Sequence, residues 1–254
     1  MTATNQSLER NRVIASPAKA PARPFRLILC AHDLSPEPVS RGDERDYWVP
    51  FGEFRALFAR LERNAALSGV ELEITSDDAF ISDYTQLLPW LLERGLGATF
   101  FVPTAFVGRP GRLAVRHLRE MRNLGMRIGS HGHDHINWEA ASPSELSRDV
   151  GQGLDRLQQM LGEPVRTVAP PFGSCNHKVM RVLEAHGFEE IHLCRGGIWR
   201  ASGAVRNRVA LERRPAAVER LIRLSRGPRG LDRLHTLLHM VRATRDLRLA
   251  AYAA

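Results

Sequence analysis

Residues 70–78 read VELEITSDD and set a pattern that the rest of the chain repeats. Apolar and polar residues alternate from Val70 to Thr75, which is the period of a β-strand with one buried face. Two carboxylates, Asp77 and Asp78, follow where this strand is expected to end. The segment therefore predicts a strand that carries two acidic side chains at its carboxyl end.

Helices and further strands are expected in alternation on both sides of this segment. Residues 51–66 place apolar side chains at spacings of three and four, the stripe of a helix packed on a sheet. The other expected strands cover residues 25–31, 98–103, 126–128, 165–169 and 190–194, and the other expected helices cover residues 84–94, 115–124, 142–161 and 178–186. Strands that alternate with helices imply a parallel sheet, and polar residues after several strands imply a site at the C-terminal face of an α/β barrel.

Length and composition favour one domain with short additions. The 254 residues are 43% apolar, which is enough to bury one full core. We expect a flexible tail over residues 1–24, a catalytic domain over residues 25–215 and a basic helical extension over residues 216–254. The sequence shows neither a signal-peptide core nor an apolar run of about 18 residues, so we expect a cytoplasmic protein.

The net charge of +8 is concentrated in the arginine-rich residues 216–254. These arginines lie between apolar residues at helical spacing, which favours an amphipathic helix with a solvated basic face. Peripheral contact with a membrane is the alternative. No nucleic-acid-binding motif accompanies the charge, so we expect no nucleic-acid partner. Three cysteines without close spacing favour buried free thiols over disulfides or a thiolate zinc site.

Residues 130–135 (SHGHDH) are the strongest local sign of a metal site. His131 and His135 are four residues apart, so both imidazoles face one ion if the segment turns helically. Imidazole suits zinc and other first-row divalent ions, and a carboxylate would complete a set of three ligands that leaves a position open for water. A hydrogen-bonded polar loop is the alternative, and His133 offers a competing pairing.

The adjacent carboxylates Asp77 and Asp78 predict a division of labour. Side chains leaving a strand in succession point in different directions, so one can bind a cation while the other handles a proton. A solvated turn or a helix cap is the alternative, with Asp78 capping a helix that begins near Ser82.

Together these clusters resemble the motifs of the polysaccharide deacetylase family, the NodB-homology carbohydrate esterases. The family's Thr-Phe-Asp-Asp-Gly motif reads Thr75-Ser76-Asp77-Asp78-Ala79 here, and its His-Ser/Thr-x-x-His motif reads His131-Gly132-His133-Asp134-His135. The resemblance extends from about residue 27 to residue 214. It implies a distorted (β/α)7-type barrel of the deacetylase kind.

The resemblance also implies a reaction and the residues that carry it. Asp78, His131 and His135 would bind a divalent metal, most often zinc, with cobalt or another first-row ion as the alternative. Asp77 would be the base in the hydrolysis of the N-acetyl amide of an N-acetylhexosamine, releasing acetate. The substrate would be a glycan or a lipid-linked sugar, as in exopolysaccharide biosynthesis.

The general acid is expected near the beginning of the chain. Residues 28–33 (ILCAHD) form an expected strand that ends in His32 and Asp33. This order resembles the family's late Leu-Leu-His-Asp motif, as in deacetylases that look circularly permuted. The resemblance implies that His32 is the general acid and that Asp33 orients it. A purely structural histidine is the alternative.

The family's third motif, Arg-Pro-Pro-Phe-Gly, lacks its arginine here because Ala169 occupies that position. In family members the guanidinium pairs with the catalytic aspartate, and Arg166 is a conceivable substitute. Residues after Ala169 that would still form a wall of the substrate groove are Pro171, Phe172 and Gly173.

Trp199 would serve as a sugar-stacking wall, with a core or interface tryptophan as an equally consistent interpretation. The missing arginine, together with Ser76 and Ala79 in place of an aromatic residue and glycine, supports an alternative function. In that interpretation the chain is a catalytically impaired carbohydrate-binding pseudoenzyme on the same fold. The intact Asp77 and His32 favour the enzyme instead.

Overall fold

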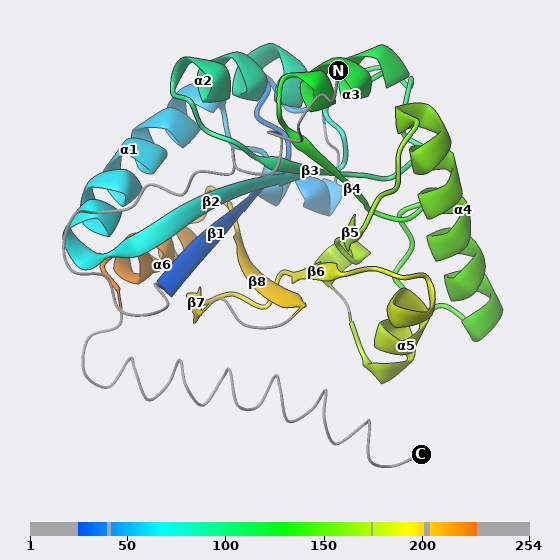
Figure 1. Cartoon of the computed structure of the whole chain (residues 1–254). Helices are drawn as coiled ribbons and strands as arrows, with labels where there is room; N and C mark the ends of the chain where they lie inside the picture. The colour runs from blue at the N-terminus through cyan, green and yellow to red at the C-terminus, as the bar shows by residue number, and fades with distance from the viewer. Residues whose placement is uncertain (1–24, 40–41, 174, 201–203, 228–254) are drawn as a thin grey trace, which may run out of the picture.

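The computed structural model describes residues 25–39, 42–173, 175–200 and 204–227, and in this part of the chain seven parallel strands close into a barrel (Figure 1). The strands follow one another around the barrel in the order β2-β3-β4-β5-β6-β8-β1, and β1 pairs again with β2. The strands are β1 (Phe25–Ala31), β2 (Val70–Asp77), β3 (Thr99–Val102), β4 (Arg127–Ser130), β5 (Thr167–Val168), β6 (Glu190–Leu193) and β8 (Val205–Ala210). A two-residue strand, β7 (Trp199–Arg200), lies antiparallel to the beginning of β1.

Helices surround the barrel on its outside (Figure 1). They are α1 (Phe51–Ser68), α2 (Leu88–Glu93), α3 (Val115–Asn123), α4 (Pro143–Leu161), α5 (His177–Ala185) and α6 (Pro215–Ser225), with the shorter turns η2 (Gly42–Tyr47), η3 (Asp83–Leu87) and η4 (Pro171–Gly173). Helix α4 begins as its sequence predicts, because the Ser142 hydroxyl accepts a hydrogen bond from the Glu145 amide in a capping box. It ends at Gly162, whose φ of 74° is the left-handed conformation that favours glycine.

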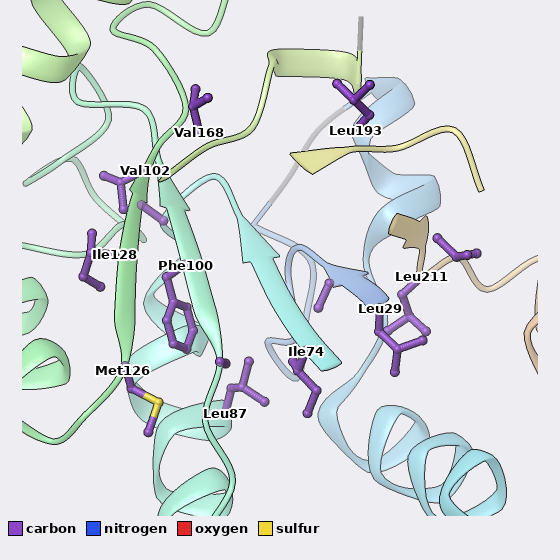
Figure 2. Packing of buried hydrophobic residues seen from close by; sticks show 14 of the residues in the cluster. Leu29, Ile74, Leu87, Phe100, Val102, Met126, Ile128, Val168, Leu193 and Leu211 are labelled. Carbon is purple, nitrogen blue, oxygen red and sulfur yellow. The ribbon is translucent and has the colours of Figure 1, made fainter. Parts of the chain in front are cut away.

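The apolar core lies between the strands and the surrounding helices. Figure 2 shows Leu29, Ile74 and Phe100 on three neighbouring strands, with Leu87 of η3 beside them, and all four are buried. Because side chains alternate along a strand, the residues next to these point into the barrel. The outward-facing side chains therefore pack against the helices, and the inward-facing side chains are not needed for that packing.

The inside of the barrel is unusually polar. Its buried inward-facing residues include Cys30 of β1, Thr75 and Asp77 of β2, His192 of β6 and Arg208 of β8. Little space remains between them, since a Cβ atom added at Gly129 would lie 2.6 Å from the Phe101 ring. The strands thus carry a compact polar cluster toward their carboxyl ends.

The predicted fold class is confirmed, and most predicted strands and helices occur close to their expected bounds. Strand β2 is longer than predicted and takes in Asp77, while β7 and β8 were not predicted. Helix α6 packs on α1, where the Asn64 amide donates a hydrogen bond to Ser225. In the described part of the chain, no helix is both long and apolar enough to cross a membrane.

The predicted tail over residues 1–24 and most of the predicted basic extension, from residue 228 onward, lie outside the described residues. The domain boundaries and the membrane contact therefore stay predictions.

Candidate active site

The carboxyl ends of the barrel strands surround a pocket with a volume of about 270 Å³. Its lining includes the predicted residues His32, Asp77, Asp78, His131, His135, Phe172 and Gly173, together with Tyr47, Cys194 and Arg220. The volume is slightly below the range of roughly 300–1,000 Å³ that is usual for small-molecule sites. The two motifs, which are far apart in the sequence, therefore meet in one place.

Three of the lining residues form a group of potential metal ligands. One donor atom each from Asp78, His131 and His135 lies within 4.8 Å of the other two. Asp78 Oδ1 is 3.1 Å from His135 Nε2 and 3.6 Å from His131 Nε2. This set, one carboxylate and two imidazoles, is a ligand set for zinc or another first-row divalent ion.

Two further observations fit a cation at this group. His131 Nδ1 is 2.6 Å from the carbonyl oxygen of Ala169, so this nitrogen donates and Nε2 keeps its lone pair directed at Asp78. Asp78 Oδ1 is buried and, among the described residues, accepts no hydrogen bond of acceptable geometry. Acceptor atoms that face one another in a buried site are the arrangement that a bound cation would satisfy.

The backbone that presents these histidines is a loop and does not turn helically, which was the condition under which their spacing would let both imidazoles face one ion. Gly132 and His135 both have left-handed φ values, 76° and 58°, and the loop that follows β4 folds back so that both imidazoles face Asp78. Asp78 and Ala79 are also left-handed, with φ values of 72° and 55°. Because this conformation disfavours a side chain, Ala79 is strained where the family has glycine.

The pKa shifts of Asp78 and His131 favour the protonation states that bind a cation. Burial would raise the pKa of Asp78, but His135 and His131 hold it well below its usual range. Burial lowers the pKa of His131 to about 4, so its imidazole is neutral at physiological pH. An ionised carboxylate and a neutral imidazole are the forms that bind a metal.

Asp77, the predicted base, is held from inside the barrel. Arg208 donates from Nη1 to Oδ1 at 2.6 Å and from Nη2 to Oδ2 at 2.8 Å. The Cys30 thiol adds a third donor, 3.3 Å from Oδ2. Burial would raise the pKa of Asp77, but Arg208 and His131 lower it to about 2, so the carboxylate stays ionised.

Arg208, which forms these contacts with Asp77, was not among the site residues predicted from the sequence. The suggested substitute, Arg166, is wrong, because it forms an ion pair with Glu189 at the surface, where both side chains are 62% exposed. No motif surrounds Arg208 in the sequence, and the contact joins residues 131 positions apart. Only the closed barrel reveals it.

The competing pairing through His133 is excluded by geometry. His133 Nδ1 lies 2.7 Å from the Thr104 hydroxyl, and its Nε2 lies 3.7 Å from the exposed Asp134. This imidazole therefore contacts Thr104 and does not line the pocket with His131 and His135.

His32 lies in the pocket beside Asp77, and its ring packs on Tyr47 with 5.0 Å between centroids. Donor atoms of Cys30, His32 and Asp77 form a second group within 4.8 Å. A cation is disfavoured there, because Arg208 already binds both oxygens of Asp77 and burial raises the pKa of the Cys30 thiol. The second group is therefore a poorer cation site than the first.

Asp33 accepts hydrogen bonds from the loop that follows β1, and its orienting role stays a prediction. Asp33 Oδ1 accepts a hydrogen bond from the Ser35 amide at 3.0 Å, and Oδ2 accepts one from the Val39 amide at 2.7 Å. The carboxylate thereby shapes the loop after β1.

The predicted substrate wall is present in part. Phe172, at a left-handed φ of 60°, is 63% exposed, and its ring centroid is 4.8 Å from that of His135. Gly173 also lines the pocket, whereas Pro171 is buried and is not among the lining residues. An exposed aromatic ring next to a potential metal ligand is suited to stacking on a sugar.

The sugar-stacking role of Trp199 stays a prediction, and the position of its backbone does not favour it. Its backbone pairs with Arg26 at the beginning of β1, whereas the pocket lies at the other end of that strand, beside His32. Another tryptophan, Trp138, is fully buried and donates its indole N–H to Asp149.

The cysteines are free, as predicted, but only Cys30 and Cys175 are buried. Cys194 is partly exposed and lines the pocket.

The buried histidine inside the barrel makes stability depend on pH. Burial lowers the pKa of His192 to about 4, whereas an exposed histidine titrates near 6.5. Between these values the unfolded chain binds a proton that the folded chain does not, so the free energy of unfolding should fall as the pH drops from about 6.5 to about 4. In urea unfolding of the metal-free protein, His192→Gln should reduce this slope by up to about 1.4 kcal/mol per pH unit. Equal slopes for the two proteins would contradict the assignment.

Comparison with known proteins agrees with this arrangement. Residues 66–191 match the sequence model of the polysaccharide deacetylase family. A peptidoglycan-N-acetylglucosamine deacetylase of Bacillus cereus is 29% identical over 121 residues, which cover 47% of this chain and 54% of the relative. The Bacillus subtilis protein YxkH, whose name marks it as a candidate polysaccharide deacetylase, is 24% identical over 116 residues, 46% of this chain and 42% of the relative. The chain thus spans about half the length of these relatives.

Solved structures share the fold. IcaB of Ammonifex degensii superposes with a TM-score of 0.68 at 22% identity, covering 80% of this chain and 98% of IcaB. The deacetylase PplD of Streptococcus pyogenes, solved with acetate, gives 0.64 at 21% identity over 80% and 99% of the two chains. The matched residues 66–191 include Asp77, Asp78, His131 and His135, and the chain belongs to the polysaccharide deacetylase family.

Proposed function

We propose that this protein is a metal-dependent hydrolase that removes the acetyl group from the N-acetyl amide of an N-acetylhexosamine in a glycan or glycolipid. One observation carries the proposal: the donor atoms of Asp78, His131 and His135 converge in the same pocket as an ionised aspartate, Asp77, and a histidine, His32. A carbohydrate-binding protein has no need of a base and an acid beside a set of metal ligands.

Zinc is the ion we propose, with cobalt or another first-row divalent ion as the alternative. A divalent ion held by Asp78, His131 and His135 would polarise the amide carbonyl and lower the pKa of the attacking water. With a pKa of about 2, Asp77 is a weak base but is ionised throughout the neutral range, so it is always able to accept that proton.

The chain's own residues divide the remaining work. Asp77 takes the proton of the attacking water, because its carboxylate is the neighbour of the metal ligand Asp78. His32 gives a proton to the departing sugar amine. Its Nδ1 is buried and has no hydrogen-bond partner among the described residues, so no hydrogen bond there ties this atom to another part of the protein. Phe172 offers an exposed face for the sugar ring.

N-acetylglucosamine is the sugar we propose to test first. The name of the Bacillus cereus relative states this sugar, and PplD was solved in complex with acetate. A pocket of about 270 Å³ is suited to one such unit with its acetamido group.

The proposal predicts metal-dependent release of acetate from N-acetylglucosamine oligomers. Removal of the metal by a chelator should abolish acetate release, and addition of zinc or cobalt should restore it, since the ligands lie in the pocket where the amide would bind. Acetate is measured by a coupled enzymatic assay on oligomers and on a lipid-linked N-acetylhexosamine. Full activity in the chelator, or no acetate from the metal-loaded protein on either substrate, would contradict the proposal.

The pseudoenzyme alternative rested on the missing arginine of the third motif together with Ser76 and Ala79. Arg208 donates a guanidinium to Asp77 from another strand, which weakens the first of these three grounds and favours the enzyme.

A further inference from the structure

The ion pair between Asp77 and Arg208 has a role beyond holding the barrel together. We propose that Arg208 is the positioning residue of the base: it supplies from β8 the guanidinium that Ala169 cannot supply from the end of β5, and it fixes the orientation in which Asp77 accepts a proton. This inference rests on the deacetylase activity proposed above.

The geometry of the contact defines one orientation of the carboxylate. Two parallel N–H···O bonds, 2.6 Å and 2.8 Å long, join the planar guanidinium to both oxygens of Asp77. Such a bidentate fork sets the plane of the carboxylate as well as its position. A single point charge would leave the carboxylate free to rotate about its own axis.

Arg208 is itself held on two further sides. Its Nη1 also donates to the Thr75 hydroxyl at 3.1 Å, and its Cζ atom lies 4.9 Å from the centre of the Phe101 ring. The residue is 0% exposed. The fork is therefore rigid, as a residue that positions another must be.

The register of the barrel shows from where the guanidinium arrives. Arg208 pairs with Ile28 of β1, which pairs with Glu73 of β2, four residues before Asp77. The arginine side chain therefore extends along the barrel interior and reaches Asp77 from the side of the amino-terminal ends of the strands. The pocket side of the base, toward the metal ligands, stays open.

Stability alone is a weak explanation for this pair. Moving two charges out of water costs several kcal/mol per ion, and well-packed apolar side chains often replace buried ion pairs without loss of stability. Here the buried pair is placed under the one carboxylate that adjoins the metal ligands. A functional constraint explains that placement.

The test removes the guanidinium from position 208 on β8 and introduces one at position 169, at the end of β5. Arg208→Met should lower kcat about 100-fold and change KM by less than about threefold, because a misplaced base slows the chemical step but leaves the sugar contacts intact. Arg208→Lys should fall between wild type and Arg208→Met. The double variant Arg208→Ala/Ala169→Arg should recover at least about tenfold of the loss, because its guanidinium approaches Asp77 from the end of β5.

Controls separate positioning from folding. Arg166→Met removes an exposed arginine and should leave kcat unchanged, since the Arg166 side chain forms an ion pair with Glu189 at the surface and is not among the residues that line the pocket. Zinc affinity should be the same in Arg208→Met and wild type, because Arg208 contacts none of the three proposed ligands. If the double variant does not fold, millimolar guanidinium ion added to Arg208→Ala should restore activity in its place.

Two outcomes would overturn the inference. The first is a folded Arg208→Met protein with the kcat of the Arg166→Met control. The second is an Asp77 carboxylate with the same orientation in crystal structures of wild type and Arg208→Met. This structural comparison is needed if metal-loaded wild type releases no acetate, a result that would refute the proposed function by itself but would not test the positioning role. A carboxylate that turns away in Arg208→Met would support it.

Discussion

Asp77→Asn should lower kcat for acetate release by about 1,000-fold, within the range usually attributed to a general base. Asparagine has nearly the same shape as aspartate but cannot accept the proton of the attacking water. The substitution also leaves the buried Arg208 without its carboxylate. Removal of one partner from a buried ion pair should lower the free energy of unfolding by about 3 kcal/mol.

The two effects can be measured separately. Steady-state acetate release gives kcat, and urea unfolding of the same preparation gives the stability. Asp134→Asn is the matched control, because its side chain is 53% exposed and lies on the histidine loop beside the site. It should change neither quantity. A folded Asp77→Asn protein that keeps more than about a tenth of wild-type kcat would show that Asp77 is not the base.

His131→Ala should weaken zinc binding by more than about 100-fold, which exceeds the usual cost of losing a residue that only supports a metal ligand. The alanine removes one of three proposed protein ligands and leaves Asp78 with a single imidazole neighbour. The dissociation constant is measured by competition with a chromophoric chelator. Acetate release at limiting zinc should fall in parallel.

His133→Ala provides the control for this measurement in the same loop. Its imidazole contacts Thr104 and Asp134, so zinc affinity should change by less than about threefold. Equal losses for His131→Ala and His133→Ala would mean that the loop is damaged as a whole, and the ligand assignment would then be wrong.

The sequence predicts well those features that depend on local pattern. Residues 70–75 alternate in polarity and lie in β2, and the helix expected from residue 142 begins there, with a capping box between Ser142 and Glu145. The two motifs around Asp78 and His131 also meet as expected, because the carboxyl ends of parallel strands share one face of the barrel.

Features that depend on the closed barrel were missed. Residues 205–210 (VRNRVA) contain two arginines and an asparagine, so their polarity concealed strand β8. An arginine is a poor candidate for a barrel interior until its partner is known, because a buried charge must be paired. The partner of Arg208 is 131 residues away, and only the pairing of β8 with β1 brings the two together.

The histidine loop and Trp199 show two further limits of local reasoning. The spacing of His131 and His135 is correct for one ion, but left-handed residues in a loop achieve it, not a helix. An aromatic residue after a predicted strand is a reasonable candidate for a sugar site. However, Trp199 belongs to a strand that pairs at the opposite end of β1, and its local sequence does not indicate which end of the barrel it reaches.

The proposed chemistry depends on Asp78, His131 and His135 forming the metal centre beside the base Asp77. Anomalous diffraction at the zinc absorption edge, from crystals of the zinc-loaded protein, locates the ion without any assumption about activity. We predict one strong peak about 2.0–2.2 Å from an Asp78 oxygen and from Nε2 of both histidines. A zinc ion held instead by Cys30, His32 and Asp77, or no peak beside Asp78, would contradict this assignment.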